Sequence, residues 1–209
     1  MIPRRYIEEW RQTVEWIDSF QVEQDLIIMR ALVAIFSDDF LKERLAFRGG
    51  TALHKLFTIP AARYSEDIDL VQIKPAPIGE VLTHLRKALL FIEGAKINVD
   101  RGEAMTTMHY RFLSEDNPPL KMKLKVEINC REHLVVYGLK PVKIEILNTW
   151  FTGNTDVNTY EPEELLGTKL RALYQRRKGR DLFDLWYGLT KLDLRPERII
   201  NAFEQYTLA

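Results

Sequence analysis

The sequence predicts an α+β protein in which a mixed β-sheet is flanked by helices and followed by a C-terminal helical bundle. Near the N-terminus and again after residue 160, apolar residues recur at spacings of three and four, the period of amphipathic helices. Residues 121–129 alternate between apolar and polar side chains, as a half-buried strand does. Shorter apolar runs between these segments predict the remaining strands.

The composition is that of an ordinary globular chain. With 209 residues, 46% of them hydrophobic, it can form one domain with a helical appendage, and we expect a core at residues 1–160 and a helical subdomain at residues 161–209. Thirty basic and thirty acidic residues cancel, so contact with RNA requires a local basic patch. The single cysteine, Cys130, excludes an internal disulfide and Cys-rich zinc sites. Neither a signal-peptide pattern nor an apolar stretch of about 18 residues is present, so we expect a cytoplasmic protein without membrane contact.

The individual elements follow from the same two periodicities and from the residues that bound them. Pro3 stands at the start of the first expected helix, where a missing N–H costs nothing, whereas Pro60 and Gly179 are expected to end helices. Helices are expected at residues 4–18, 22–36, 51–57, 78–92, 161–178, 180–189 and 196–206. Strands are expected at residues 45–47, 67–71, 96–99, 108–112, 121–129 and 142–147. Residues 151–160 are polar and predict a loop that joins the sheet to the C-terminal helices.

A phosphate-binding turn is predicted where the first strand meets the following helix. Gly49 and Gly50 let the backbone approach a phosphate closely, and the first amides of the helix lack intrahelical partners and favour an anion. Thr51 and Ser65 can donate hydrogen bonds to phosphate oxygens, and Arg63 offers a planar fork of donors. A glycine pair before a helix is also a common turn, so this segment alone does not define a site.

Two carboxylates on the next strand predict a cation site. In a strand over residues 67–71, Asp67 and Asp69 point to the same face, where they repel each other unless a cation lies between them. Mg²⁺ prefers such oxygen ligands and keeps open positions for water and substrate phosphates. If residues 121–129 lie beside this strand, Glu127 supplies a third carboxylate; pairing with lysines on a wet face is an equal alternative.

A second group of charged residues lies in the C-terminal helices. Lys169, Arg176, Arg180, Asp181 and Asp184 fall within sixteen positions. From the sequence alone, Asp181 can be a helix N-cap, and the arginines can compensate the dipole at a helix C-terminus. These structural roles are at least as well supported as functional ones.

Together these motifs resemble those of the nucleotidyltransferase superfamily: an apolar residue, Gly-Gly or Gly-Ser, a helix and then Asp-x-Asp. The runs FRGGTALHK, RYSEDIDL and KLRALYQRRKGRDLFDLW, which begin at Phe47, Arg63 and Lys169, are similar more closely to the AbiEii/AbiGii toxin family, which includes the MenT-type toxins. Gly-Gly-Thr replaces the usual Gly-Ser, and the interval to Asp67 is longer than in many nucleotidyltransferases. Both departures agree with the AbiEii branch.

The resemblance implies metal-dependent transfer of a nucleoside monophosphate (NMP) from an NTP to an acceptor hydroxyl. Asp67 and Asp69 would bind Mg²⁺ or Mn²⁺, and Glu127 would help to deprotonate the acceptor. Lys169 would offset the triphosphate charge, and Asp181 would hold a basic residue or activate the acceptor. In MenT-type members the acceptor is the 3′ end of tRNA, which makes tRNA or another RNA a candidate partner. The family also implies a toxin of a toxin–antitoxin or phage-defence pair, with a cognate antitoxin.

Two other interpretations belong to different classes. A catalytically silent nucleotide- or RNA-binding module is the alternative, although intact Asp67, Asp69 and Lys169 argue against it. A haloacid-dehalogenase-type phosphatase would use Asp67 within the run DIDLV, but that fold requires an apolar strand before its first aspartate. Residues 63–66 are polar, so the phosphatase is excluded.

Overall fold

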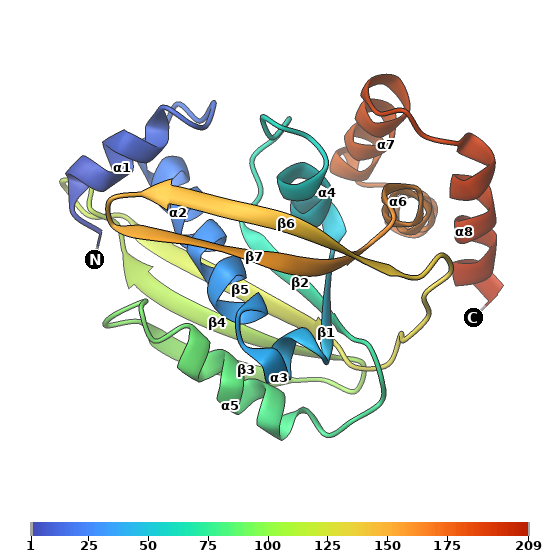
Figure 1. The fold of residues 1–209 in the computed structure, drawn as a ribbon, viewed down its shortest axis with the longest axis horizontal. Coiled ribbons are helices and arrows are strands. Elements are labelled where there is room, and N and C mark those ends of the chain that lie inside the picture. Colours follow the sequence, from blue (N-terminus) through green and yellow to red (C-terminus); the bar gives the residue numbers. More distant parts are fainter. Residues whose placement is uncertain (1, 209) are drawn as a thin grey trace.

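The computed structural model describes residues 2–208, which form a seven-stranded mixed sheet and eight helices (Figure 1). The strand order is β3-β4-β5-β2-β1-β7-β6. The strands are β1 (Leu45–Arg48), β2 (Asp67–Gln72), β3 (Lys96–Arg101), β4 (Met105–Leu113), β5 (Lys121–Asn129), β6 (Leu139–Asn148) and β7 (Phe151–Tyr160). The helices are α1 (Arg4–Arg11), α2 (Ser19–Phe36), α3 (Asp39–Lys42), α4 (Gly49–Leu56), α5 (Ile78–Ala88), α6 (Pro162–Arg176), α7 (Gly179–Lys191) and α8 (Pro196–Leu208).

Strand β2 lies at the centre of the sheet. It pairs antiparallel with β1 and parallel with β5, so Asp69 lies opposite Arg48 on one side and opposite Glu127 on the other. Beyond β5, the strands β4 and β3 continue the sheet in antiparallel order. On the other side, β7 pairs parallel with β1 and antiparallel with β6. The α+β class predicted from the sequence is therefore confirmed.

At β5 the core lies on one face of the sheet, whereas β1 is buried on both faces. On β5, Met122, Leu124, Val126 and Ile128 are buried, whereas the polar residues between them point to the other face. Helix α2 is buried along most of its length and packs against β5 and β7. Helices α6, α7 and α8 are grouped at one end of the sheet, away from α1 (Figure 1).

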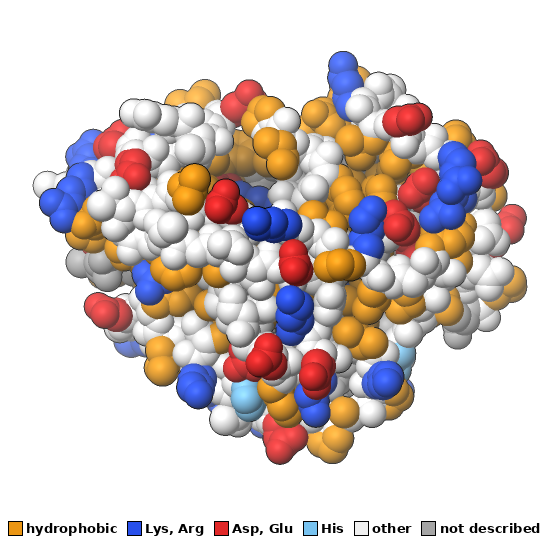
Figure 2. All heavy atoms as spheres, in the orientation of Figure 1, with side chains coloured by type: hydrophobic (Ala, Val, Ile, Leu, Met, Phe, Trp, Pro, Cys, Tyr) orange, Lys and Arg blue, Asp and Glu red, His pale blue; other side chains and the backbone are white. Residues whose placement is uncertain are grey.

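The charged residues do not form one large patch on the face drawn in Figure 2, where basic and acidic side chains are intermixed. This agrees with the equal numbers of basic and acidic residues in the chain. None of the helices within residues 2–208 combines the length and the apolarity that crossing a bilayer requires.

Residues 151–160 form strand β7, so the expectation of a loop there is wrong. β7 pairs with β6 along its whole length and meets β1 where Thr159 lies opposite Phe47. Its polar side chains bond to the backbone of neighbouring elements: Thr159 Oγ1 donates to Phe47 O at 2.7 Å, and Asn158 Nδ2 donates to Lys42 O at 2.7 Å. A polar sequence can therefore form a strand here, because its hydrogen bonds are satisfied within the fold.

Helix α1 ends at Arg11, several residues earlier than the apolar periodicity predicts. Arg11 Nη1 donates to the backbone oxygen of Ile17 at 2.8 Å. Trp10 and Trp16 both donate to the carboxylate of Asp25 at 2.9 Å. The segment between α1 and α2 is thus held against α2 by indole hydrogen bonds, and it does not continue the helix.

The bend between α6 and α7 is made by Arg177, which has a φ of 49°. This left-handed conformation is uncommon for a residue other than glycine. Gly179, which was expected to break the helix, is instead the first residue of α7.

Helix α2 buries a carboxyl group at the edge of an apolar cavity. Glu23 is 2% exposed and lines a cavity of about 800 Å³ together with Ile27, Phe91 and Trp150. The backbone N–H of Glu115 donates to Glu23 Oε2 at 3.0 Å. Burial outweighs this hydrogen bond and raises the pKa of Glu23 to about 7.

Replacing Glu23 by glutamine should therefore stabilise the protein at pH 8. Since the pKa of this carboxyl rises from 4.5 to about 7 on folding, it favours the folded state below pH 4.5, and this contribution is lost as the pH rises through about 7. Glutamine accepts the same hydrogen bond but does not ionise. Urea unfolding at several pH values should give E23Q a free energy of unfolding ~1–3 kcal/mol above that of the natural protein at pH 8. If the free energies of unfolding of the two proteins changed with pH in parallel, this account would be contradicted.

Candidate active site

Strand β2 presents Asp67 and Asp69 on the same face of the sheet. Its parallel pairing with β5 places Lys125 opposite Asp67 and Glu127 opposite Asp69. Neighbouring strands are roughly 5 Å apart, so three carboxylates and one ammonium group gather on this face. Glu127 therefore occupies the place predicted for a third acid beside the aspartate pair.

The Lys125 ammonium group lies between two of these carboxylates. Its Nζ is 3.0 Å from Asp67 Oδ2 and 3.0 Å from Glu127 Oε2. Burial alone would lower the pKa of Lys125, but the hydrogen bonds and charges of Glu127 and Asp67 raise it, so the lysine remains charged. Burial, together with the charges of Glu127 and Asp67, raises the pKa of Asp69 to about 6. The acidic cluster is thus only partly neutralised and favours a further cation.

The turn from β1 into α4 passes directly over Asp69. Gly49 has a φ of 84°, and a Cβ at this position would overlap the Asp69 carboxylate. A Cβ at Gly50 would overlap the guanidinium group of Arg63. Glycine is therefore required at position 49 by both backbone conformation and space, whereas a Cβ at position 50 would displace the Arg63 guanidinium group.

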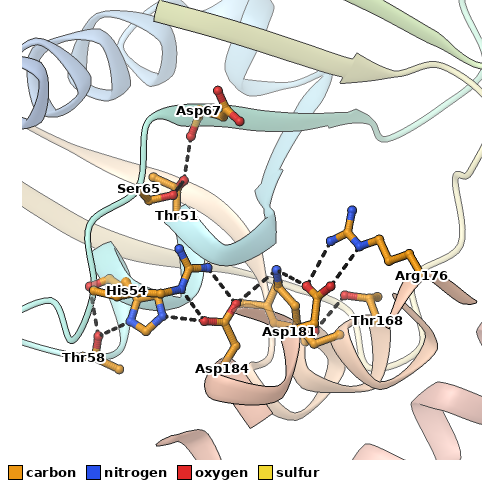
Figure 3. Close-up of polar contacts among 12 residues, drawn as sticks. Thr51, His54, Thr58, Ser65, Asp67, Thr168, Arg176, Asp181 and Asp184 are labelled. Atoms are coloured by element: carbon orange, nitrogen blue, oxygen red, sulfur yellow. Dashed lines mark hydrogen bonds and ion pairs between the residues drawn. The ribbon is translucent and has the colours of Figure 1, made fainter. Parts of the chain in front are cut away.

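Thr51 and Ser65 connect α4 to the start of β2 (Figure 3). Thr51 Oγ1 donates to the backbone oxygen of Asp67 at 2.6 Å and lies 2.5 Å from Ser65 Oγ. Thr51 is buried. These hydroxyls position the first residue of β2, and their donation to a phosphate stays a prediction.

Helix α6 contributes Lys169, which lies among the charges of α7. Its Nζ is 3.2 Å from Asp181 Oδ1 and 3.1 Å from Asp184 Oδ2. Arg176 donates to both oxygens of Asp181, each at 2.9 Å (Figure 3). Burial alone would raise the pKa of Asp181, but Arg176 and Lys169 hold it below its ordinary value. Asp181 therefore pairs with two basic residues, and its part in activity stays a prediction.

Asp184 joins the C-terminal helices to α4 and the loop that follows it. Arg63 Nε donates to Asp184 Oδ1 at 2.6 Å, and Arg63 Nη2 donates to Asp184 Oδ2 at 2.8 Å. His54 Nε2 lies 2.9 Å from Asp184 Oδ1 (Figure 3). Burial alone would raise the pKa of Asp184, but Arg63, His54 and Lys169 hold it well below its usual range. The donor fork of Arg63 is thus directed at Asp184, and its contact with a triphosphate stays a prediction.

A cleft of about 270 Å³ lies between the sheet and helix α6. The residues predicted from the sequence that line it are Gly49, Asp69, Glu127 and Lys169. The predicted residues that lie beside or behind it are Gly50, Thr51, Arg63, Ser65, Asp67 and Asp181. The cleft thus combines residues from β1, β2, β5 and α6, far apart in the sequence.

Three basic residues of this cleft were not predicted as site residues. Arg48, Arg171 and Arg176 line it beside Lys169. Arg48 Nη1 lies 2.5 Å from Glu132 Oε2, and Arg171 contacts the other oxygen of Glu132. The antiparallel register of β1 with β2, which places Arg48 opposite Asp69, is the signal that would have identified it. For Arg171 and Arg176, the only signal was a dense run of basic residues.

The donor set of the cluster suits a hard divalent cation. Asp67, Asp69 and Glu127 offer carboxylate oxygens, and the Lys125 ammonium already lies between two of them as a positive charge. Within residues 2–208, no group of three or more His, Cys, Asp or Glu side chains is arranged to hold a metal ion by itself. A cation would therefore complete its coordination with water or substrate oxygens, as Mg²⁺ commonly does.

This fold, with carboxylates opposed across β2 and β5, is that of the nucleotidyltransferases. Among solved structures, the chain is similar to the nucleotidyltransferase toxin MenT4 from Mycobacterium tuberculosis H37Rv, with 18% sequence identity and a TM-score of 0.61 over 92% of this chain and 66% of that one. It is also similar to an antigenic nucleotidyltransferase-like protein from Paracoccidioides brasiliensis, with 17% identity and a TM-score of 0.50 over 88% of this chain and 87% of that one. The chain thus spans just under two thirds of the length of MenT4.

A family model described as nucleotidyl transferase AbiEii toxin, type IV TA system, matches residues 30–209, and the chain belongs to this family. The resemblance drawn from the sequence motifs is therefore confirmed, as is the assignment of the protein to the nucleotidyltransferases. No curated protein matches the sequence.

Proposed function

We propose that this protein transfers an NMP from an NTP to an acceptor hydroxyl in a metal-dependent reaction that releases pyrophosphate. The observation that carries the proposal is the register of β2 with β5, which aligns Asp69 with Glu127 on the face to which Asp67 also points. This face forms one wall of a cleft whose other wall contains Lys169. As a member of a toxin family, the protein would be the toxin of a toxin–antitoxin or phage-defence pair, neutralised by a cognate antitoxin.

Asp67 and Asp69 would hold Mg²⁺ or Mn²⁺, with Glu127 beside them. When bound, the metal would supply Lewis-acid stabilisation of charge on the triphosphate. Lys125 would release at least one of its two carboxylates when a divalent cation binds, because the two positive charges repel each other at such short range.

The residues of the chain would bind the NTP, orient the acceptor hydroxyl and accept its proton. The acceptor oxygen would form a bond to the α-phosphorus while the bond from that phosphorus to the pyrophosphate oxygen breaks, and Glu127 would accept the proton of the acceptor hydroxyl. Lys169, with Arg48 and Arg176 in the same cleft, would offset the negative charge of the phosphates. Catalysis would then consist largely of positioning and electrostatic stabilisation.

The acceptor that we favour is RNA, with the 3′ end of tRNA as one candidate. The basic wall of the cleft supports a polyanionic partner, although the net charge of the whole chain is zero. The protein would act in the cytoplasm, where NTPs and RNA are both present. Helices α6, α7 and α8 would form the C-terminal subdomain, which contributes Lys169 to the cleft.

A nucleotide-incorporation assay tests this function. The protein is incubated with total cellular RNA and each of the four labelled NTPs, with Mg²⁺ or Mn²⁺. We expect one or more NTPs to label RNA. If neither RNA nor protein is labelled with either metal, the chain is instead a catalytically silent nucleotide- or RNA-binding module.

Replacing Lys125 by methionine should weaken the metal-free fold and enhance its response to Mg²⁺. Without the ammonium group, the carboxylates of Asp67 and Glu127 repel each other, so the free energy of unfolding in EDTA should fall by ~1 kcal/mol. Mg²⁺ should then raise the Tm of K125M by more than it raises that of the natural protein. Thermal unfolding in EDTA and in Mg²⁺ measures both effects, with Lys143→Met, an exposed lysine of β6, as the matched control. Identical Mg²⁺ responses would show that Lys125 does not compete with the metal.

A further inference from the structure

The sheet face that carries the acidic cluster continues as a basic surface away from the cleft. The registers of β3 with β4 and of β4 with β5 place Lys96, Arg111 and Lys123 side by side across three adjacent strands; we call these three residues the cation row. All three are exposed, and none of them forms an ion pair within residues 2–208. Lys123 and Glu127 are four positions apart on β5, so the cation row lies on the same face as the carboxylates, roughly 13 Å along the strand.

The next row toward the cleft has balanced charges. In that row, Lys125 is paired with Asp67 and Glu127, and His109 Nε2 lies 3.2 Å from Oδ2 of Asp100, which comes from the following row of β3. Like charges directly opposite each other on neighbouring strands are destabilising, by roughly 0.2–1 kcal/mol for each pair. The cation row therefore costs stability in the isolated protein, and an external anion would relieve this cost.

The dimensions of the surface suit an extended polyanion. The cation row spans two strand separations, roughly 10 Å, and Lys121 adds a further exposed positive charge on β5, on the side away from the cleft. At its inner end the surface meets a cleft of only about 270 Å³, which admits the end of a single strand but no duplex.

The chemistry of the row favours nucleic acid over protein. Ammonium and guanidinium groups are the donors that neutralise phosphates without regard to sequence. The three side chains of the row are all basic, and the one exposed apolar side chain in the next register position of β4 and β5 on this face is Leu113, opposite Lys121. A single apolar side chain is less than the cluster of desolvated anchors on which protein interfaces depend.

We propose that the cation row binds the phosphate backbone of a single-stranded nucleic-acid acceptor and leads its terminal hydroxyl to Asp69 and Glu127. This inference rests on the proposed nucleotidyl transfer and specifies the path of the acceptor. The strand runs along β5, with phosphates over the cation row and its end in the cleft beside α6.

Binding can be measured without catalysis. A fluorescein-labelled single-stranded RNA of about 12 nucleotides is titrated, without NTP, with the natural protein, with Lys123→Glu and with the double variant Lys96→Glu/Lys123→Glu. We expect K123E to raise the Kd about tenfold and to reduce the log–log salt slope by about one, with a larger loss in the double variant. A glutamate at position 123 lies opposite Arg111, so the fold should be retained.

Lys143→Glu is the matched control, because it makes the same change in net charge on β6, at the opposite edge of the same sheet. It should change the Kd less than about twofold. Equal weakening by K143E and K123E would overturn the proposal, and so would tighter binding of a poly-glutamate peptide than of the RNA at equal salt.

NMP transfer to the same RNA, measured in parallel, separates this inference from the proposed function. K123E should raise the KM for RNA and leave both kcat and the KM for NTP unchanged. If K123E and the natural protein transferred NMP to the RNA with the same KM for RNA, the acceptor path would be overturned and the proposed function would stand. RNA binding that depends on the row, without transfer by the natural protein, would support the binding surface and overturn the proposed function.

Discussion

Asp69→Asn is expected to lower NMP transfer by at least about 10³-fold, since a metal site supplies several kcal/mol of transition-state stabilisation and about 1.4 kcal/mol corresponds to a tenfold rate. Asp69 lines the cleft and lies opposite Glu127, at the point where the metal and the triphosphate would meet. Incorporation of labelled NMP into RNA at saturating Mg²⁺ measures the loss. Asp156→Asn, the same substitution at an exposed position of β7, should leave the rate unchanged.

The same substitution should make the metal-free protein more stable at pH 7. Because the pKa of Asp69 is raised from 3.8 to about 6 by burial and by the charges of Glu127 and Asp67, the carboxyl favours folding below pH 3.8, and this contribution is lost as the pH rises through about 6. Asparagine does not ionise and avoids that cost. Urea unfolding in EDTA should therefore give D69N a free energy of unfolding equal to or above that of the natural protein, although its NMP transfer is lost. A D69N protein with more than about a tenth of the natural rate would remove Asp69 from the proposed mechanism.

Asp184→Asn should have the opposite consequence, a loss of roughly 3–5 kcal/mol in the free energy of unfolding. Asp184 is fully buried and is the common partner of Arg63, His54 and Lys169. An amide at this position leaves the positive charge of Arg63 without its carboxylate partner and leaves Lys169 with Asp181 as its one remaining anion on α7. Urea denaturation at pH 7 measures the change.

The pH dependence of the Asp184 effect provides a second check. Since the pKa of Asp184 is depressed by its partners, its contribution to stability is present above the unfolded pKa and is lost as the pH falls below it. The difference in the free energy of unfolding between D184N and the natural protein should therefore become smaller in acid. Asp193→Asn, in the exposed segment after α7, should cost less than about 0.5 kcal/mol at any pH. A D184N protein as stable as D193N would show that the buried network does not support the fold.

The faces of strands β2 and β5 were predictable because side-chain alternation is a local property of a strand. The pattern in residues 67–71 and 121–129 was sufficient to group Asp67 with Asp69 and to assign Glu127 to a polar face. That β2 and β5 are neighbours, and that they run parallel, depends on packing across the whole sheet. Lys125 illustrates the difference: its alternation was visible, but its position between Asp67 and Glu127 required the register.

Long-range partners account for the rest. Arg63 is a generic anion-binding residue when it is considered with its neighbours, but its fork is directed at Asp184, 121 positions later in the chain. Strand β7 was predicted to be a loop because its polar residues were judged without the backbone groups that satisfy them. In both cases the deciding interaction lies outside any local window of sequence.

The dependence of Arg63 and His54 on Asp184 has a consequence for the order in which the site can be assembled during synthesis. The chain emerges from the ribosome from its N-terminus, so the sheet and the acidic cluster are synthesised before Lys169 and Asp184 exist. A nascent or prematurely terminated chain would have the carboxylates but neither the second wall of the cleft nor the anion that holds Arg63. If NMP transfer is the function, a chain that ends before Lys169 would therefore lack this activity.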